Sequence, residues 1–148
     1  MLRAIALASA MTLLGPGCSR PPPVGVVSGT VRLDGRPAAK VLVTFLPDPA
    51  KGSRGPRSAA ATDAQGRYRL RCDDQRDGAV VGWHRVVFED LALYAAPRDE
   101  NSRRTAGLPP SRIPPVYRDP RRTPLEVDVG PDDQTHDFDL SSTQPPKP

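Results

Sequence analysis

The sequence has little of the side-chain chemistry on which many enzymes and metal sites depend. Its 148 residues include two histidines, His84 and His136, and two cysteines. A zinc site usually takes about four ligands, mostly cysteine and histidine, so the sequence argues against one. The sequence also has no Gly-x-Ser-x-Gly elbow, no His-Glu-x-x-His motif and no evident pair of a nucleophile with a base. These absences predict a protein that is not an enzyme and that carries no metal or other cofactor.

Aromatic residues are also scarce, at 5% of the chain, whereas prolines number 19 and glycines 12. This composition favours short strands and long loops over helices. The formal net charge of +4 is compatible with an anionic partner. However, arginines outnumber lysines by 18 to 3, a bias that often reflects a GC-rich genome. No basic helix or basic surface interleaved with aromatic residues is evident, so a nucleic-acid partner is not expected.

The apolar run at the N-terminus is too short to cross a bilayer, which takes roughly 20 residues. This run, Ala4–Leu14, follows a start that carries Arg3 and precedes small residues, as in a secretory signal peptide. A cysteine after small residues resembles the bacterial lipoprotein box, so residues 1–17 are predicted to be the signal peptide and Cys18 the lipidated residue. The box departs from the usual pattern, because Gly15 stands where leucine is common. The alternatives are a signal peptide that is cut elsewhere or a structural thiol at Cys18.

Ser19 after the cysteine, in place of aspartate, resembles the pattern that sorts lipoproteins to the outer membrane. We therefore expect a membrane anchor at Cys18 and a location in the cell envelope, at the periplasmic face of the outer membrane or at the cell surface. Residues 18–25, with Pro21–Pro23, are predicted to be a stiff tether, because proline fixes φ and donates no hydrogen bond. Once Cys18 is acylated, Cys72 has no disulfide partner within the chain. A buried side chain is the favoured interpretation of Cys72, and a reactive or intermolecular thiol is the alternative.

Alternating apolar residues predict β-strands through most of the remaining chain. In Val27–Leu46 two such runs surround an Asp-Gly pair, and residues 34–40 between them are too many for a two-residue hairpin. That connection is therefore expected to join two sheets. A turn at Asp63–Gly66 is expected to close a hairpin. The strongest apolar segment, Ala79–Phe88, is apolar on both faces, which favours a central strand and a core position for His84.

A hairpin of two strands around Gly130–Asp133 is predicted to close the fold. Acidic residues on its outward faces are expected to form a negative strip, which could receive the arginine-rich loop, weakly bind a cation or protect a sheet edge. Edge protection is the cautious interpretation. These acids are Glu126, Asp128, Asp137 and Asp139. The inward residues of all the strands are expected to form a sufficient core: Val31, Leu33, Val41, Val43, Phe45, Tyr68, Leu70, Val86, Phe88, Leu125, Val127, Phe138 and Leu140.

The ordered set of motifs resembles a known family. The motifs are VSGTVRLDGRPAAKVLVTFLP, TDAQGRYRL, GWHRVVF, the stretch Pro114–Pro120, and PLEVDVGPDDQTHDFDL. Together they are similar to the transthyretin-like, carboxypeptidase-regulatory-like β-sandwich, and above all to small lipoproteins of planctomycete bacteria. The resemblance spans roughly residues 24–140 and implies an all-β, seven-stranded Greek-key sandwich, with no catalytic residues to carry over. We place the sandwich at residues 26–141 and a polar tail at 142–148.

The segment 89–123 is predicted to be a long basic loop within the sandwich, and such loops tend to be functional or disordered. Between Arg98 and Arg122 it holds seven arginines against three acids, a net charge of +4. One interpretation is a basic arm for anionic lipid, a surface polymer or an acidic protein. The other is a solvated loop whose arginines pair with nearby acids. The candidate interaction residues here and on the preceding strand are Trp83, Arg103, Arg104, Arg112, Tyr117 and Arg118.

The anchor, the expected sandwich and the absence of catalytic motifs favour a non-catalytic, lipid-anchored module of the cell envelope. Such a module is expected to mediate a protein interaction or to contribute to surface architecture, with an envelope protein or a surface polymer as partner. The alternative is a carbohydrate- or peptide-binding module, which needs an exposed aromatic platform. Only Trp83, Tyr94 and Tyr117 are available for one, and for Trp83 we slightly favour cover by the following loop.

Overall fold

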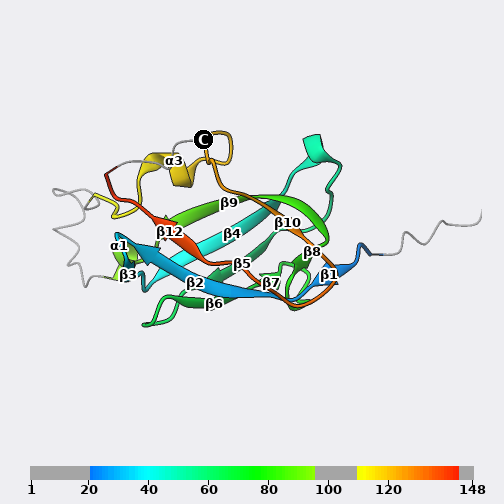
Figure 1. Ribbon diagram of the computed structural model, residues 1–148, viewed down its shortest axis with the longest axis horizontal. Coiled ribbons are helices and arrows are strands. Elements are labelled where there is room, and N and C mark those ends of the chain that lie inside the picture. The colour runs from blue at the N-terminus through cyan, green and yellow to red at the C-terminus, as the bar shows by residue number, and fades with distance from the viewer. Residues whose placement is uncertain (1–20, 96–109, 144–148) are drawn as a thin grey trace, which may run out of the picture.

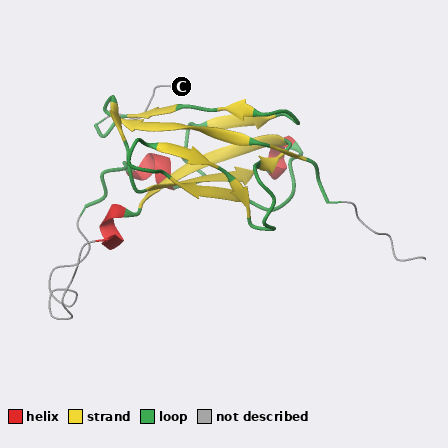
Figure 2. Cartoon of the chain, turned by 90° about the horizontal axis from the view of Figure 1, so that it is seen from below, coloured by secondary structure: helices red, strands yellow, loops and turns green. Residues whose placement is uncertain are grey.

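The computed structural model describes residues 21–95 and 110–143, which form an all-β structure with short helical turns. The strands are β1 (Val24–Gly25), β2 (Val27–Leu33), β3 (Arg36–Pro37), β4 (Val41–Pro47), β5 (Ser58–Ala61), β6 (Arg67–Arg69), β7 (Arg71–Cys72), β8 (Ala79–Val80), β9 (Gly82–Asp90), β10 (Glu126–Val129), β11 (Gln134–Thr135) and β12 (Phe138–Leu140). The helical turns are η1 (Pro49–Lys51), α1 (Ala92–Ala95) and α3 (Pro115–Arg118). Two larger sheets lie against each other as layers (Figures 1 and 2).

The first layer, the β4 sheet, has the strand order β10-β9-β4-β5-β7. Its longest ladder joins β4 to β9 in antiparallel register, from Val41 opposite Asp90 to Pro47 opposite His84. The predicted central strand is confirmed, since β9 has a partner on each side. Its first two residues form the separate short strand β8. The break falls at Val81, just before Gly82, whose φ of 123° is one that other residues rarely adopt.

The second layer, the β2 sheet, is centred on β2, with β11 and β12 on one side and β3 and β6 on the other. The connection from β2 to β4 crosses between the layers, as the sequence predicts. It also contains a hairpin that we did not predict. Asp34 and Gly35 have φ values of 51° and 76° and pair Leu33 with Arg36. An Asp-Gly pair is strongly favoured in such a tight turn, so β3 forms before the chain crosses.

For two predicted hairpins, the turn is followed by a strand that pairs with a different partner from the predicted one. The Asp63–Gly66 turn does form, with the Asp63 carboxylate accepting from the backbone N–H groups of Gln65 and Arg67. After it, however, β6 pairs with β2, and only β7 returns to β5. Likewise β10 pairs with β9, whereas β11 and β12 pair in parallel with β2. The predicted negative strip is therefore divided between the two layers.

One hydrophobic core fills the space between the layers. All the predicted core residues are buried except Leu33 and Leu125, which are partly buried against the same cluster. Phe138 packs against Phe45, Tyr68 and Phe88, with ring centroids 6.1, 6.4 and 5.3 Å away. Burial of each large apolar side chain stabilises the fold by about 1.5–3 kcal/mol. The residues Val27, Ala38, Ala79, Val80, Ile113, Tyr117 and Val129 are also buried.

The tether joins the folded body earlier than the predicted boundary at residue 26. Val24 and Gly25 form β1, which pairs with Val80 and Ala79 of β8. A Cβ atom at Gly25 would lie 2.0 Å from the carbonyl oxygen of Gly130, so only glycine fits this close approach. The boundary moves because backbone pairing, rather than hydrophobicity, holds these residues.

The predicted loop at 89–123 also begins too early, since β9 continues through Glu89 to Asp90. Beyond Arg85, β9 has no partner in β10, and α3 of the segment 110–123 packs against β9. The Thr123 hydroxyl donates to the Val86 carbonyl at 2.7 Å. Buried side chains of this segment thus take the place of a strand.

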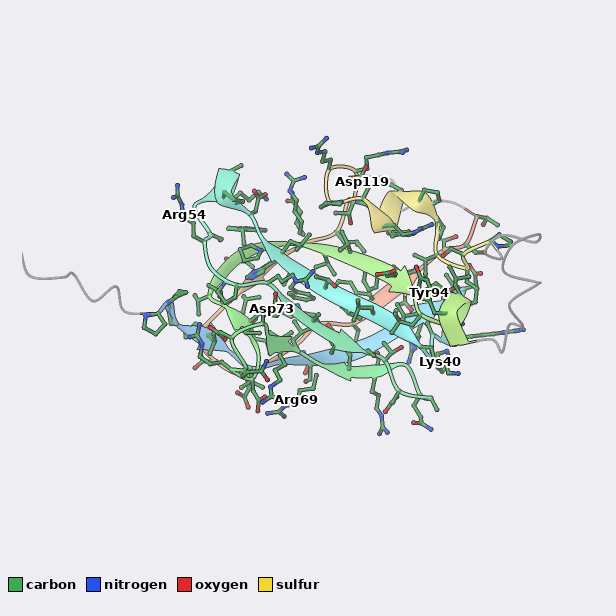
Figure 3. All side chains as sticks on the ribbon, turned by 180° about the vertical axis from the view of Figure 1, so that it is seen from behind. Lys40, Arg54, Arg69, Asp73, Tyr94 and Asp119 are labelled. Atoms are coloured by element: carbon green, nitrogen blue, oxygen red, sulfur yellow. The ribbon has the colours of Figure 1, made fainter. Side chains whose placement is uncertain are left out.

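The molecule has two distinct ends. We call the end with β1 and β8 the tether end, and the end with β3 and α1 the distal end (Figure 1). The strand β9 runs between them over nine residues, or about 30 Å. From behind, Arg54 lies toward the tether end, and Lys40 and Tyr94 toward the distal end (Figure 3).

Candidate functional site

Trp83 is the most exposed aromatic residue among the predicted site residues. It lies on the outer face of the β4 sheet, and 38% of it is exposed. The cover that we favoured from the following loop is wrong. Instead Lys51 of η1 places its Nζ 4.0 Å from the ring centroid, and the same ammonium pairs with Glu126. A cation over an aromatic face is attracted by the ring, so Trp83 is engaged within the chain.

Tyr117 was predicted as an interaction residue, and this prediction is wrong. Its side chain is fully buried in α3, beside buried Ile113, where both pack into the core. The aromatic platform expected for a sugar ligand is therefore reduced to Trp83 and Tyr94. These two lie toward opposite ends of β9, because Trp83 is its second residue and Tyr94 follows its last.

Arg112 is also held within the fold. Its guanidinium donates to both carboxylate oxygens of Asp90, at 2.9 and 2.6 Å, and to the Ala39 carbonyl at 3.0 Å. The Asp90 side chain is fully buried. These bonds from Arg112 keep the pKa of Asp90 below its usual range. For this arginine, the expected pairing with a nearby acid is what the structure shows.

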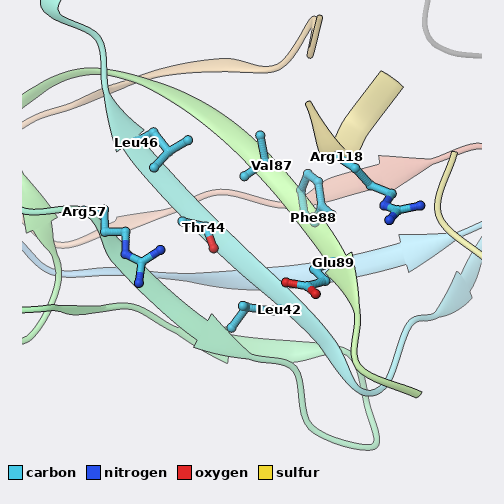
Figure 4. Close-up of a pocket in the computed structure, with 8 residues that line it drawn as sticks. All are labelled: Leu42, Thr44, Leu46, Arg57, Val87, Phe88, Glu89 and Arg118. Carbon is cyan, nitrogen blue, oxygen red and sulfur yellow. The ribbon is translucent and has the colours of Figure 1, made fainter. Parts of the chain in front are cut away.

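Arg118 is exposed at the rim of a groove on the outer face of the β4 sheet (Figure 4). It makes no ion pair with another residue of the ranges 21–95 and 110–143. The groove has a volume of about 290 Å³. Its lining consists of Leu42, Thr44, Leu46, Arg57, Val87, Phe88, Glu89 and Arg118.

The floor of the groove comes from β4 and β9. Thr44 is only 7% exposed, between partly buried Leu42 and Leu46, and Val87 lies opposite it on β9. Sequence reasoning did not select these residues, although a signal was present. The run from 41 to 47 is apolar on its second parity as well as on the parity that faces the core.

The charged residues on the rim of the groove differ in whether they have a partner within the fold. Arg57 pairs with Asp73 at 2.9 Å, and both side chains are more than half exposed. Glu89 accepts a hydrogen bond from the Tyr94 hydroxyl at 3.1 Å, which raises the pKa of Tyr94. Of the two rim arginines, Arg118 is thus the one that makes no ion pair within the described residues, and it shares the rim with the Glu89 carboxylate.

Each of the two histidines has a hydrogen-bond partner within the chain, His84 with Gly82 and His136 with Gln134. His84 is fully buried in the core, and its Nδ1 donates to the Gly82 carbonyl at 2.8 Å. Burial lowers its pKa, which favours the neutral ring. The predicted core position with one hydrogen bond is confirmed. No group of three potential metal-ligating side chains occurs in the part of the chain that the structure describes.

Several predicted features lie outside the described residues. They are the signal peptide at 1–17, the lipidation site Cys18, Arg103, Arg104 and the last part of the polar tail. The other cysteine, Cys72, is buried as predicted, with its sulfur 3.1 Å from the Ser58 hydroxyl oxygen. Within residues 21–95 and 110–143, no helix has the length and apolar character that a membrane crossing requires.

Comparisons with known proteins add no relative. No family model matches the chain, and neither the curated proteins nor the solved structures yield a match. The site must therefore be interpreted from its own geometry. That geometry offers an apolar groove with an available arginine, a cation-covered tryptophan and a tether bound to the body.

Proposed function

We propose that this chain is a non-catalytic, lipid-anchored module of the cell envelope that mediates a protein interaction or contributes to surface architecture. One observation carries most weight, which is the way the tether joins the body. Arg76 donates to the Pro22 carbonyl at 2.6 Å, and the Val81 N–H donates to the Pro23 carbonyl at 2.9 Å. The residues between Cys18 and Pro22 span at most about 14 Å. An acyl chain at Cys18 would therefore hold the tether end close to the membrane.

The finer fold belongs to the same proposal. We take the domain to be a seven-stranded Greek-key sandwich of the transthyretin-like, carboxypeptidase-regulatory-like type. Support comes from joining contiguous segments into longer strands. With β6 joined to β7, β8 to β9 and β11 to β12, residues 21–95 and 110–143 form seven main strands, and β1 and β3 are short additions.

The tether geometry gives the module an orientation. With the tether end at the membrane, the distal end faces away from it, and the groove lies along the side. This arrangement suits a module that presents a surface to a neighbour at the periplasmic face of the outer membrane or at the cell surface. It leaves the protein-interaction role better supported than sugar binding, because Tyr117 is buried and the Trp83 ring, although 38% exposed, already binds the Lys51 ammonium.

The anchor is tested by fractionation of cells that produce the full-length chain, with labelling by a clickable palmitate analogue. The wild-type chain is expected in the membrane fraction and labelled. Cys18→Ala is expected to lose the label and to leave the membrane fraction. Cys72→Ala is the matched control, since this cysteine is buried and should leave both readouts unchanged. Recovery of an unlabelled wild-type chain from the soluble cytoplasm would overturn the proposal.

A further inference from the structure

The outer faces of the two layers differ in polarity. On β2 the outward side chains are Ser28, Thr30 and Arg32, all polar. On β4 the outward side chains are Leu42, Thr44 and Leu46. An antiparallel sheet with one face in water normally alternates apolar inward and polar outward residues. The β4 sheet departs from this rule on the face that carries the groove.

The neighbouring strands extend the apolar floor with small side chains. Ala59 and Ala61 of β5 lie opposite Thr44 and Leu42, and Val87 flanks Thr44 on β9. Small residues let an incoming backbone approach closely. The distance from Leu42 to Leu46 is about 13 Å along the strand, which matches four residues of an extended segment. The groove therefore has the size of a short peptide segment.

The rim selects the charge of that segment. Arg57 and Arg118 lie on opposite sides of the groove (Figure 4), but Arg57 already pairs with Asp73, so Arg118 is the rim arginine without an ion pair within the described residues. The carboxylate of Glu89 is also on the rim, where it accepts a hydrogen bond from the Tyr94 hydroxyl. Arginine is well suited to bind carboxylates, because its planar guanidinium donates two parallel hydrogen bonds. An apolar segment with an aspartate or glutamate beside Arg118 therefore matches both the apolar floor and the unpaired arginine of the rim.

A second copy of this chain is a poorer occupant. Two copies anchored in one membrane would pack face to face about a two-fold axis along the strands. That axis sets β5 of one copy against β9 of the other. Arg57, next to Ser58 at the start of β5, would then face Arg85 and Arg118 of the second copy. Asp73 and Asp48 are already held by Arg57 and Arg85, so Arg118 of each copy would meet no unpaired carboxylate in that contact, whereas an acidic segment supplies one.

We propose that the groove between Arg57 and Arg118 is a docking site for an acidic, apolar segment of another envelope protein. This inference rests on the proposed function, because the partner must share the compartment. The floor of Leu42, Leu46 and Val87 binds the apolar side chains of the segment, and Arg118 binds a carboxylate. An interface such as this groove gains most of its binding free energy from a few well-packed residues.

The test places photoreactive benzoylphenylalanine at Ala61, an exposed position beside Leu42, in the full-length chain in its own cells. A second probe at exposed Arg57 guards against a folding defect at the first. After illumination, adducts in the membrane fraction are mapped to peptides by mass spectrometry. We expect one recurrent peptide from a different protein, with apolar residues next to aspartate or glutamate. Arg118→Glu and Leu42→Glu should each lower its yield about tenfold.

The matched control is a probe at exposed Arg69 on the outer face of the β2 sheet, which should not capture this peptide. The inference is overturned by adducts between two copies, by adducts to lipid or polymer alone, by a peptide without acidic residues, or by no adduct from a membrane-bound chain. Recovery of the chain in the soluble fraction would instead overturn the anchor. The acidic adduct there would still support docking, and its absence would overturn both.

Discussion

Two arginines hold the two ends of the molecule with the same set of groups. At the tether end, Arg76 donates to the Asp74 carboxylate at 2.9 and 2.7 Å and to the Pro22 carbonyl at 2.6 Å. At the distal end, Arg112 donates to the Asp90 carboxylate and to the Ala39 carbonyl. Each arginine thus joins a carboxylate to the backbone of a segment distant in sequence.

We call Arg76 with Asp74, and Arg112 with Asp90, the two arginine clamps. They differ in how exposed the carboxylate is to water. The Asp74 side chain is 38% exposed, whereas that of Asp90 is fully buried. Asp90 also accepts from the backbone N–H groups of Ala92 and Arg112. A buried charge that loses its partner costs far more than an exposed one. The burial of the acid, rather than the number of hydrogen bonds, therefore decides how much each arginine stabilises the fold.

The largest effect is expected for Arg112→Ala, which leaves the Asp90 carboxylate buried without its cation. We expect a loss of about 2–3 kcal/mol in the free energy of unfolding, measured by urea denaturation of the detergent-solubilised chain. The loss is less than for a fully buried pair, because the Arg112 side chain is 43% exposed. Arg57→Ala, which breaks the exposed pair with Asp73, is the control and should cost under about 1 kcal/mol. Equal losses would show that burial does not distinguish these pairs.

A smaller effect is expected on the pH dependence of the free energy of unfolding, which should differ between variants of Asp90 and Asp74. The pKa of Asp90 is lowered by the hydrogen bonds from Arg112, so its stabilisation is present above the unfolded value of about 3.9 and is lost as pH falls below it. The stability difference between the wild-type chain and Asp90→Asn should therefore narrow between pH 5 and pH 2. His84, whose pKa is lowered by burial, destabilises both proteins alike as pH falls through about 6.5, so its contribution cancels.

The control for this experiment is Asp74→Asn. Its carboxylate is bound by Arg76 but remains partly exposed, so solvent screens the pair. We expect a weaker dependence on pH for this difference. If the stability difference between the wild-type chain and Asp74→Asn narrowed between pH 5 and pH 2 as strongly as that for Asp90→Asn, burial would not distinguish the two aspartates.

The side of a strand on which a residue lies could be predicted from the sequence. Facing is a local property, because successive residues of a strand point to opposite sides. Parity alone therefore placed Val31, Phe45 and Val86 correctly in the core. It also predicted that His84 is a core residue rather than a ligand.

Strand partners and burial outside strands depend on distant residues, so local patterns did not reveal them. The chain changes layer between β6 and β7 with no interruption of its alternation. Tyr117 lies in a segment without strand periodicity, and it is buried in the core through α3, which packs against β9. The arginines of this segment look alike in sequence, yet Arg112 is held by a buried acid and Arg118 is not. The groove had a sequence signal in the second apolar parity of β4, but its rim comes from separate loops and helices.

The smallest global effect is expected for Arg76→Ala, at under about 1 kcal/mol in the free energy of unfolding. Its local effect should be larger, because Arg76 fixes the Pro22 carbonyl beside the β1–β8 pair. We expect faster hydrogen exchange at the Val81 amide, which donates to the Pro23 carbonyl. Arg71→Ala is the matched control, since Arg71 bonds within the same loop to Gln75 and makes no bond to the tether. Unchanged exchange at Val81 would mean that β1 holds the tether without Arg76, and the tether end would then need no clamp of the kind that Arg112 forms.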